Sequence, residues 1–453
     1  MSKSKNIGRR DFLRQGAAAA VGAAGLPYIL SSSALGADGG VAASERIGLG
    51  FIGLGSRGTD HLKMFVPMKE AQVLAVCDVD RGRCEAAKRR VEEGYARAGS
   101  TDTPRAGSTG SPQAGSKVCD TYNDFREMLA RGDIDAVVIA TPEHWHGLTM
   151  IAAAKAQKDI YGEKALTLMV GEGRVLCDTV RKFRRVFQVG TQQRSDKNFR
   201  HACELAQNDY LGKVHTVTVG VPGGHKVPNS PTIPVPKGFD YDMWLGPAPE
   251  APYNALRCTS PEGWYHIYDY CAGWIQSWGV HHIDVALWGA PGLAESQLEV
   301  DGTAVFSTEG QSNTSLTWRV NFVTPGGLKL RFSDDVFYKH GCHFEGDKGW
   351  VHVTREGIWA EPKSLLDVKI KPNEIHLYES KDHHTNFLEC VRSRREPAAP
   401  VEAGHTATTA TLVADIATRI GRKIVWDWKS EQFVNDEEAN KMLKRTMRSP
   451  WRL

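Results

Sequence analysis

The stretch Ile47-Gly-Leu-Gly-Phe-Ile-Gly-Leu-Gly-Ser-Arg-Gly58 decides the fold of this chain. A short apolar run that ends in glycines predicts a buried strand followed by a tight turn and a helix. Glycines spaced G-x-G-x-x-G permit the turn and let the backbone and the helix N-terminus approach a pyrophosphate. The residues expected at this dinucleotide site are Gly53, Gly55, Ser56, Arg57 and Gly58. The alternative is a glycine-rich turn kept only for packing.

An acidic residue supports the dinucleotide interpretation. Asp78 ends the next predicted strand, 73–77, and follows Gly55 by 23 residues. A carboxylate there can accept hydrogen bonds from both ribose hydroxyls of NAD and would repel the 2′-phosphate of NADP. We therefore expect NAD, although NADP stays possible because of the nearby cations Arg57, Arg81 and Arg83.

Strands and helices alternate over the first third of the chain. Further strand patterns occupy 136–140, and helical patterns occupy 81–93, 122–130 and 144–156. Such alternation predicts βαβ units and a parallel sheet covered on both faces. We assign residues 44–165 to this Rossmann domain. Within it, residues 95–117 are rich in Gly, Ser, Thr and Pro, which predicts a mobile surface loop or, alternatively, a lid.

The remaining residues, 166–453, have a different pattern. Helices are expected at 171–183, 198–206 and 405–420, and strands at 186–189, 214–221, 315–323, 328–333, 350–354 and 367–370. Residues 222–261 are rich in Pro and aromatic residues and predict a long loop. The fold class is thus α/β, with a Rossmann domain followed by an α+β domain that carries a mostly antiparallel sheet.

Composition excludes several classes of function. The 453 residues include 56 Lys plus Arg and 53 Asp plus Glu, a net charge of only +3, so no nucleic-acid partner is expected. The nine cysteines are odd in number and scattered without a C-x-x-C pair. A disulfide framework or a zinc site is therefore not expected, although one or two bridges stay open.

The N-terminus indicates export. Five basic residues in the first 14 precede an uncharged, Ala- and Gly-rich stretch, 17–30, which is too short and too weakly apolar to span a bilayer. The consecutive Arg9 and Arg10 resemble a twin-arginine export signal, which predicts the translocase as a partner and a periplasmic or otherwise exported protein. We place this signal at residues 1–43; the alternative is an uncleaved N-terminal anchor.

Polar residues follow two strands at the edge of the sheet where ligands of such folds bind. Thr141 and Pro142 follow the fourth strand, and His146 lies in the helix that begins there, either for packing or near the cofactor. Glu163 and Lys164 follow the fifth strand. A lysine in this cleft suits proton exchange with an alcohol, whereas the alternative is a solvated lysine paired with its neighbouring glutamate.

Together these motifs resemble the Gfo/Idh/MocA oxidoreductases, from Arg46 to the C-terminus. The later stretch Gly273-Trp-Ile-Gln-Ser-Trp-Gly-Val-His-His-Ile-Asp284 also carries the resemblance. The strings at 189–194, 242–249 and 432–440 resemble an exported branch of that family. The resemblance implies a nicotinamide cofactor and a C-terminal open sheet that often mediates oligomers, so a homo-oligomer is expected.

The resemblance also implies roles for single residues. The family's E-K-P motif carries its Lys over to Lys164, on the reacting hydroxyl, and its histidine motif carries over to His281, with His282 and Asp284 positioning that imidazole or the substrate. Two departures are present: Ala165 replaces the Pro, and Ser277 stands where an Asp is expected. A serine can hydrogen-bond a hydroxyl but cannot stabilise a cation or hold a proton at neutral pH.

The substrate expected is a small carbohydrate or cyclitol, because aromatic, amide and guanidinium groups suit polyhydroxylated ligands. Further residues expected to line the cleft are Gln192, Arg194, Arg257, Trp264 and Tyr270. An exported enzyme would carry its NAD and restore it in each cycle. Either paired sugar oxidation and reduction or glycoside cleavage by transient oxidation and elimination meets this condition. A non-catalytic carbohydrate-binding relative is the rival, and a two-carboxylate hydrolase ranks below it.

Overall fold

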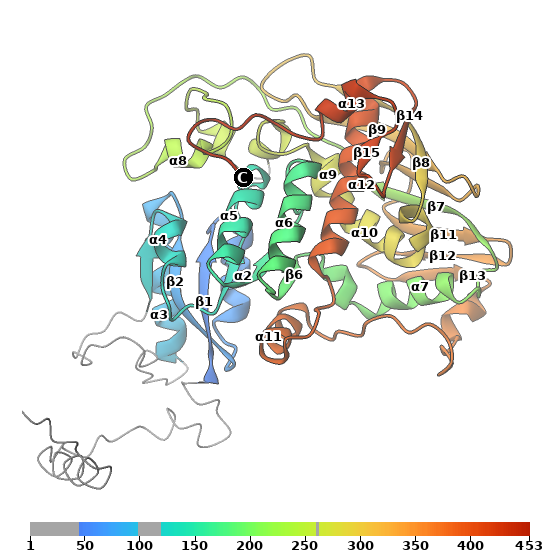
Figure 1. Cartoon of the computed structure of the whole chain (residues 1–453), viewed down its shortest axis with the longest axis horizontal. Coiled ribbons are helices and arrows are strands. Elements are labelled where there is room, and N and C mark those ends of the chain that lie inside the picture. The colour runs from blue at the N-terminus through green and yellow to red at the C-terminus, as the bar shows by residue number, and fades with distance from the viewer. Residues whose placement is uncertain (1–44, 98–118, 260–261) are drawn as a thin grey trace, which may run out of the picture.

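The computed structural model describes residues 45–97, 119–259 and 262–453. The expected export signal and residues 98–117 of the expected loop lie outside these ranges. Residues 95–97 were expected in that loop but belong to a helix, and the Tyr95 hydroxyl accepts a 2.7 Å hydrogen bond from Val73 N. Figure 1 shows the two sheets beside each other, with the C-terminus lying over the first domain.

The first sheet has six parallel strands in the order β3-β2-β1-β4-β5-β6. They are β1 (Ile47–Ile52), β2 (Ala71–Cys77), β3 (Asp120–Tyr122), β4 (Ala136–Ile139), β5 (Asp159–Gly162) and β6 (Phe187–Val189). The associated helices are α2 (Ser56–Phe65), α3 (Arg81–Arg97), α4 (Phe125–Leu129), α5 (Glu143–Lys155) and α6 (Val170–Lys182). This strand order confirms the Rossmann fold.

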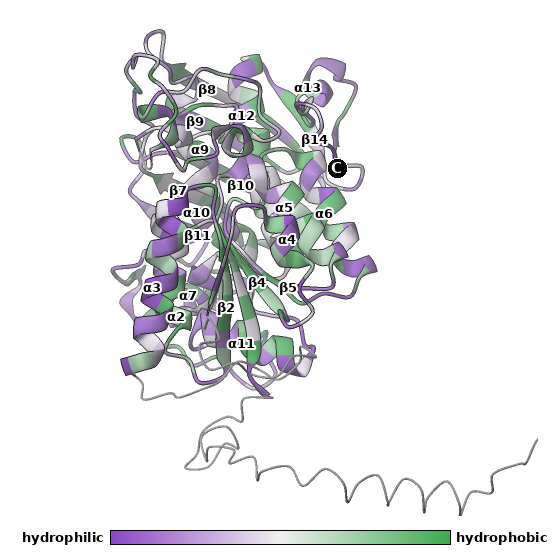
Figure 2. Cartoon of the chain, turned by 90° about the vertical axis from the view of Figure 1, so that its left-hand side faces the viewer, coloured by the Kyte–Doolittle hydropathy of each residue, from purple (hydrophilic) through white to green (hydrophobic). Residues whose placement is uncertain are grey.

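Alternating strand residues build one core on each face of this sheet. In β4, Val137 and Ile139 pack with the core that includes α5 and α6, whereas Ala136 and Val138 pack with the core that includes α2 and α3. Apart from Gln72 in β2, these buried strands are apolar, as a sheet covered on both faces requires. Figure 2 shows the contrast between these strands and the hydrophilic outer helix α3.

Two details of the first domain differ from expectation. The sheet extends past residue 165, because β6 pairs in parallel with β5, with Phe187 opposite Ile160. The helix expected at 122–130 is shorter, since Tyr122 ends β3 and the Asp124 side chain caps α4 by accepting a hydrogen bond from Arg126 N.

The second sheet has nine strands in the order β13-β12-β11-β7-β10-β9-β8-β14-β15, and every pair except β7 with β10 is antiparallel. The strands are β7 (Val214–Val221), β8 (Gln297–Phe306), β9 (Ser315–Val323), β10 (Lys329–Asp334), β11 (Gly341–Gly346), β12 (Gly349–Val353), β13 (Ile358–Glu361), β14 (Ile424–Asp427) and β15 (Gln432–Phe433). The open, mostly antiparallel sheet is thus confirmed.

Helices cover one face of this sheet. The helices of this part are α7 (Lys197–Gln207), α8 (Tyr241–Leu245), α9 (Trp274–Ser277), α10 (Gly279–Gly289), α11 (His383–Ser393), α12 (Val401–Ile420) and α13 (Glu437–Lys441). Both α10 and α12 pack against the sheet, around buried Trp318, Phe332 and Phe344. The central helix α12 covers the expected range 405–420 and begins four residues earlier.

The prediction of a strand at 367–370 is wrong. Residues 363–367 form a 3-10 helix, and the residues after it have no regular structure. Four alternating residues are a weak signal when Pro362 and Pro372 bound them. The sequence also failed to indicate β8, β11, β13, β14 and β15.

The described residues bear on two features considered from the sequence, a membrane-spanning segment and disulfide bridges. Within them, no helix is long and apolar enough to cross a membrane. All nine cysteines lie in the described part of the chain and are free thiols, eight of them buried.

We predict that Gly58→Ala destabilises the first domain. A Cβ at residue 58 would lie 1.9 Å from the Gly53 carbonyl oxygen, so the turn or α2 would have to move. Overpacking of this kind costs about 1–3 kcal/mol of unfolding free energy. Thermal unfolding should show a lowered midpoint for Gly58→Ala and an unchanged one for Gly132→Ala, where the added Cβ meets open space. Equal midpoints for the two variants would contradict the prediction.

Candidate active site

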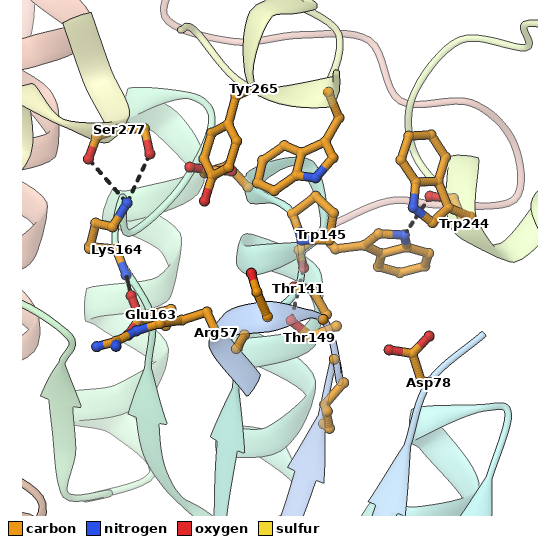
Figure 3. Close-up of a pocket in the computed structure, with 18 of the residues that line it drawn as sticks. Arg57, Asp78, Thr141, Trp145, Thr149, Glu163, Lys164, Trp244, Tyr265 and Ser277 are labelled. Carbon is orange, nitrogen blue, oxygen red and sulfur yellow. Dashed lines mark hydrogen bonds and ion pairs between the residues drawn. The ribbon is translucent and has the colours of Figure 1, made fainter. Parts of the chain in front are cut away.

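A cavity of about 530 Å³ lies at the carboxyl edge of the first sheet and is closed by residues of the second domain. In a doubly wound sheet the ligand crevice forms at this edge, where the strand order reverses between β1 and β4. Figure 3 shows side chains from both domains converging on it. Those expected from the sequence are Gly53, Gly55, Ser56, Arg57, Asp78, Thr141, Pro142, Glu163, Lys164, Gln192, Trp264, Ser277 and His281.

The glycine-rich turn forms one end of the cavity. Gly53 has φ +86°, and a Cβ there would lie 2.6 Å from the Ala140 carbonyl oxygen. A Cβ at Gly55 would meet only the end of the Arg83 side chain, at 3.9 Å, so this backbone faces open space. Gly58 permits close packing of α2 on the turn and does not itself line the cavity.

Asp78 lies beside this turn. Its carboxylate accepts hydrogen bonds from Leu54 N at 2.6 Å and from Asp80 N at 2.9 Å. Burial raises the pKa of Asp78, while the Arg83 guanidinium and these two N–H groups oppose that effect. The carboxylate is thus fixed at the end of β2, where it can accept further hydrogen bonds.

Glu163 is held by a buried cluster. Its Oε1 accepts a 2.8 Å hydrogen bond from Arg57 Nε and lies 2.7 Å from His61 Nε2. Burial alone would raise the pKa of Glu163, but Arg57 and His61 hold it well below its usual range. Glu163 is therefore an ionised anchor between β5 and α2.

The Lys164 side chain points away from the Glu163 carboxylate. Its Nζ donates to Ser277 Oγ at 2.8 Å and to the Ser277 carbonyl oxygen at 3.1 Å, across the junction between the domains. Only its backbone N–H contacts the Glu163 carboxylate, at 3.1 Å. The alternative of a solvated lysine paired with its neighbouring glutamate is therefore wrong. The Lys164–Ala165 peptide bond is cis.

His281 faces the same space from α10. It is 9% exposed, and its Nδ1 has no hydrogen-bond partner among the described residues. Burial, reinforced by repulsion from Lys164 and Arg355, holds the pKa of His281 well below its usual range. The imidazole is therefore neutral at neutral pH and can exchange hydrogen bonds with a ligand.

Five residues expected to contact substrate do not line the cavity. Arg194 forms a bidentate ion pair with buried Asp284, at 2.7 and 2.8 Å. Arg257 donates to the hydroxyl of buried Tyr270 at 3.2 Å. His282 packs against His340 and Phe199. The two arginines thus have partners inside the second domain and His282 is packed among rings there, so the pattern of polar residue types assigned structural residues to the ligand.

His146 also lies off the cavity wall. Its ring nitrogens are 2.7 Å from the Ala165 carbonyl oxygen and 2.8 Å from the Thr141 carbonyl oxygen. It therefore ties α5 to the two segments that carry Thr141 and Lys164. This is the packing role that the sequence left open.

Sequence reasoning predicted only Trp264 of an aromatic wall of the cavity. Trp264 and Tyr265 stack with ring centroids 3.8 Å apart, and Lys164 Nζ lies 5.8 Å from the Tyr265 centroid. Trp274 and Trp278 complete the wall. The tryptophans of the Gly273–Asp284 stretch were a visible signal, but their direction depends on the positive φ of Gly273, +91°.

Sequence reasoning also missed Glu143, the first residue of α5. It lines the cavity, is 1% exposed, and neither carboxylate oxygen has an ion-pair partner or a well-aligned hydrogen bond among the described residues. Burial raises the pKa of Glu143 to about 7, partly opposed by Lys164. Its place directly after Thr141-Pro142 at the ligand edge was the signal that could have found it.

Comparison with known proteins agrees with this geometry. Residues 47–191 match the oxidoreductase family's NAD-binding Rossmann fold, and residues 219–453 match its C-terminal alpha/beta domain. The chain belongs to the Gfo/Idh/MocA oxidoreductase family. Its first domain is thus the family's NAD-binding domain, as the glycine-rich turn predicted.

Two curated proteins are similar in sequence to part of this family member. Myo-inositol 2-dehydrogenase of Thermotoga maritima is 26% identical over 171 residues, which are 38% of this chain and 44% of that protein. A glycosyl hydrolase family 109 protein of Saccharopolyspora erythraea is 33% identical over 194 residues, 41% of this chain and 39% of that protein. The similarity thus spans less than half the length of either relative.

Solved structures share the fold. The WlbA dehydrogenase of Bordetella pertussis, in complex with NADH and UDP-GlcNAcA, superposes with a TM-score of 0.56 at 16% identity, covering 83% of this chain and 98% of that one. Scyllo-inositol dehydrogenase of Lactobacillus casei, with NAD(H) and scyllo-inositol, gives 0.54 at 16% identity, covering 85% and 99%.

The residues of this family member fit a nicotinamide dinucleotide. The open backbone at Gly55 and the fixed carboxylate of Asp78 suit the pyrophosphate and the adenosine ribose. Thr141 Oγ1 is buried without a partner among the described residues, so it can hydrogen-bond the cofactor. The described residues hold no group of three or more His, Cys, Asp or Glu side chains that could bind a metal ion.

We predict that Asp78→Asn weakens NAD binding roughly tenfold, because a hydrogen bond to a charged acceptor contributes about 1.5–3 kcal/mol. It should also reduce the preference for NAD over NADP, because the repulsion of a 2′-phosphate is removed. Calorimetric titration with both cofactors measures the two affinities. Asp178→Asn neutralises an exposed carboxylate on α6 and should leave both affinities unchanged. An unchanged preference in Asp78→Asn would contradict this role.

Proposed function

We propose that this protein is an exported, NAD-dependent oxidoreductase that acts on a hydroxyl group of a sugar, cyclitol or glycoside. The observation that carries the proposal is the position of Lys164, whose Nζ faces the cavity beside Ser277 and the Tyr265 ring. A hydroxyl bound there would lie between a proton-exchanging amine and a dinucleotide on the glycine-rich turn.

The chain's residues would share the work of this reaction. Bound NAD supplies a hydride acceptor. Lys164 would exchange the proton of the reacting hydroxyl, and neutral His281 would hydrogen-bond the same or an adjacent hydroxyl. The Trp264 and Tyr265 rings would pack on the apolar face of the sugar ring and exclude water. Glu163, already bound by Arg57 and His61, would fix the backbone beside Lys164.

Export shapes the chemistry that we propose. Arg9 and Arg10 favour transport of the folded protein through the twin-arginine translocase. Because free nicotinamide cofactors are scarce outside the cytoplasm, the enzyme would retain NAD and restore it within each turnover. Paired oxidation and reduction of two sugars fits this requirement.

Glycoside cleavage by transient oxidation and elimination is the second candidate. The 33% identity to a glycosyl hydrolase family 109 protein favours it. We also propose a homo-oligomer, built on the face of the nine-stranded sheet opposite α10 and α12. A non-catalytic binding protein is less consistent with the site, because Lys164 keeps an ordered position on the cavity wall despite Ala165 and Ser277.

We predict that the exported fraction yields protein with NAD or NADH bound in about equal amount. Denaturation should release the dinucleotide, which absorbance and mass spectrometry identify. Protein that is empty and fails to bind either nicotinamide cofactor at millimolar concentration would contradict cofactor recycling and favour the binding-protein alternative.

We predict that Ser277→Asp lowers turnover by about tenfold or more. A second carboxyl beside Glu143 would force one of the two to keep a proton and would pair with the Lys164 ammonium, which impairs its proton exchange. Turnover is measured over a panel of inositols, sugars and glycosides, with Ser277→Ala as the control that adds no charge. A gain in turnover would instead indicate a site that has decayed from an aspartate-containing ancestor.

A further inference from the structure

We propose that Glu143 is a catalytic acid–base group that exchanges a proton with Lys164 and keeps the substrate's hydroxyl proton inside the cavity between oxidation and reduction. This proposal rests on the proposed function of the site. It assigns to α5 the carboxyl that the sequence lacks at Ser277.

The position of Glu143 is unusual for a carboxyl group. It is 1% exposed and lines the cavity, yet its oxygens have no ion-pair partner and no well-aligned hydrogen bond among the described residues, and only the Ser277 hydroxyl and the Cys271 thiol interact with them as hydrogen-bonding groups. Burying an unpaired carboxylate is costly, so such a group is either protonated or close to a cation. Lys164 is the cation whose charge acts on it most strongly.

The other buried carboxyl groups near Glu143 have ion-pair or hydrogen-bond partners. Glu163 contacts Arg57 and His61, and Glu172 accepts a 2.6 Å hydrogen bond from Arg445. Asp78 accepts two backbone N–H groups. Among these carboxyls, Glu143 is therefore the one that can change protonation without breaking an ion pair or a hydrogen bond from another residue's backbone.

The titratable and polar groups that face Glu143 come from four segments. Lys164 follows β5, Ser277 ends α9, Cys271 precedes α9, and Tyr265 lies in a 3-10 helix. Burial raises the pKa values of Cys271 and Tyr265, so both stay neutral. On its own helix, burial lowers the pKa of His144 to about 3 and also lowers that of His146, so neither carries charge. Lys164 and Glu143 are thus the two groups that can exchange a proton in this part of the cavity.

The proposed step balances. The substrate C–H bond breaks and its electron pair moves as hydride to bound NAD⁺, the oxidant, giving NADH. The Lys164 ammonium gives one proton to the Ser277 hydroxyl, which passes its own proton to the Glu143 carboxylate, and Lys164 takes the substrate's hydroxyl proton in exchange. The products are a ketone, NADH and protonated Glu143. Reduction of a ketone reverses each transfer.

Charge conservation in the cavity favours this arrangement. Oxidation of the substrate removes the positive charge of the nicotinamide ring, and protonation removes the negative charge of Glu143. The net charge of the closed site therefore stays constant, which avoids the cost of creating an uncompensated charge away from water.

The pH dependence has a definite sign. Glu143 accepts a proton only when ionised, so hydroxyl oxidation should rise with pH through the pKa of Glu143, near 7. Ketone reduction needs the protonated form and should fall through the same range. Lys164→Met should raise this pKa further, because the ammonium that lowers it is lost.

The first experiment needs neither substrate nor cofactor. Infrared spectra of the full protein with isotope-labelled glutamate should show a carboxylic acid band that disappears with a midpoint near pH 7. Glu143→Gln should remove the band. Glu143→Asp should also remove it, because the aspartate carries no isotope label. Lys164→Met should move the midpoint to higher pH. Glu204→Gln is the matched control, because Glu204 is buried on α7 outside the cavity and accepts a hydrogen bond from Leu377 N. A band that Glu143→Gln leaves in place, or a midpoint unmoved by Lys164→Met, would overturn the proposal.

The second experiment follows single-turnover hydride transfer over the pH range. Glu143→Gln should slow oxidation about 10²-fold or more and abolish the limb near pH 7, while NAD affinity stays unchanged. Glu143→Asp should restore part of the rate, and Glu204→Gln should keep the wild-type profile. An unchanged profile in Glu143→Gln would overturn the proton exchange. If the wild-type protein oxidises none of the panel, the proposed function fails, and the infrared titration still decides whether Glu143 and Lys164 share a proton.

Discussion

The arrangement of the site depends on one shared carboxylate. Glu163 joins Arg57 and His61 of α2 to the end of β5, and His61 continues the link to His384 of α11, with ring nitrogens 2.9 Å apart. Because a buried ionised group must keep its partners, this cluster fixes three elements at once. The adjacent backbone is then held, and Lys164 can reach only across the junction to Ser277.

The same physical constraint governs the rest of the cavity. His281 is kept neutral by burial beside Lys164, and Glu143 sits between its charged and neutral forms for the same reason. The aromatic wall lowers the local polarity and so strengthens each of these interactions. The ligand that we propose for this surface is a neutral, hydroxyl-rich ring, with hydrogen bonds at Lys164 and His281 and packing on Trp264 and Tyr265.

Several elements that leave a recognisable pattern within a short stretch of sequence were predicted correctly. The buried strands of the first sheet, the glycine-rich turn and Asp78 follow from apolar runs and spacing, and their positions agree with the structure. The failures have physical causes. The strand β8 carries a local signal that was missed, the alternation Gln297-Leu-Glu-Val-Asp301, which Gly302 interrupts before the part that pairs with β9 alone. Arg194 and Asp284 are 90 residues apart, so their ion pair was invisible and each was assigned to the ligand.

The sequence by itself determined the Rossmann fold, the cofactor end of the cavity and the position of Lys164, because strand periodicity and turn glycines act over short distances. It also predicted an export signal at residues 1–43, which lie outside the described residues, so this stays a prediction. Only the tertiary structure decided which polar side chains face the cavity. Burial and the pairing of charges from distant segments removed Arg194, Arg257 and His282 from it, and they left Glu143 unpaired beside Lys164.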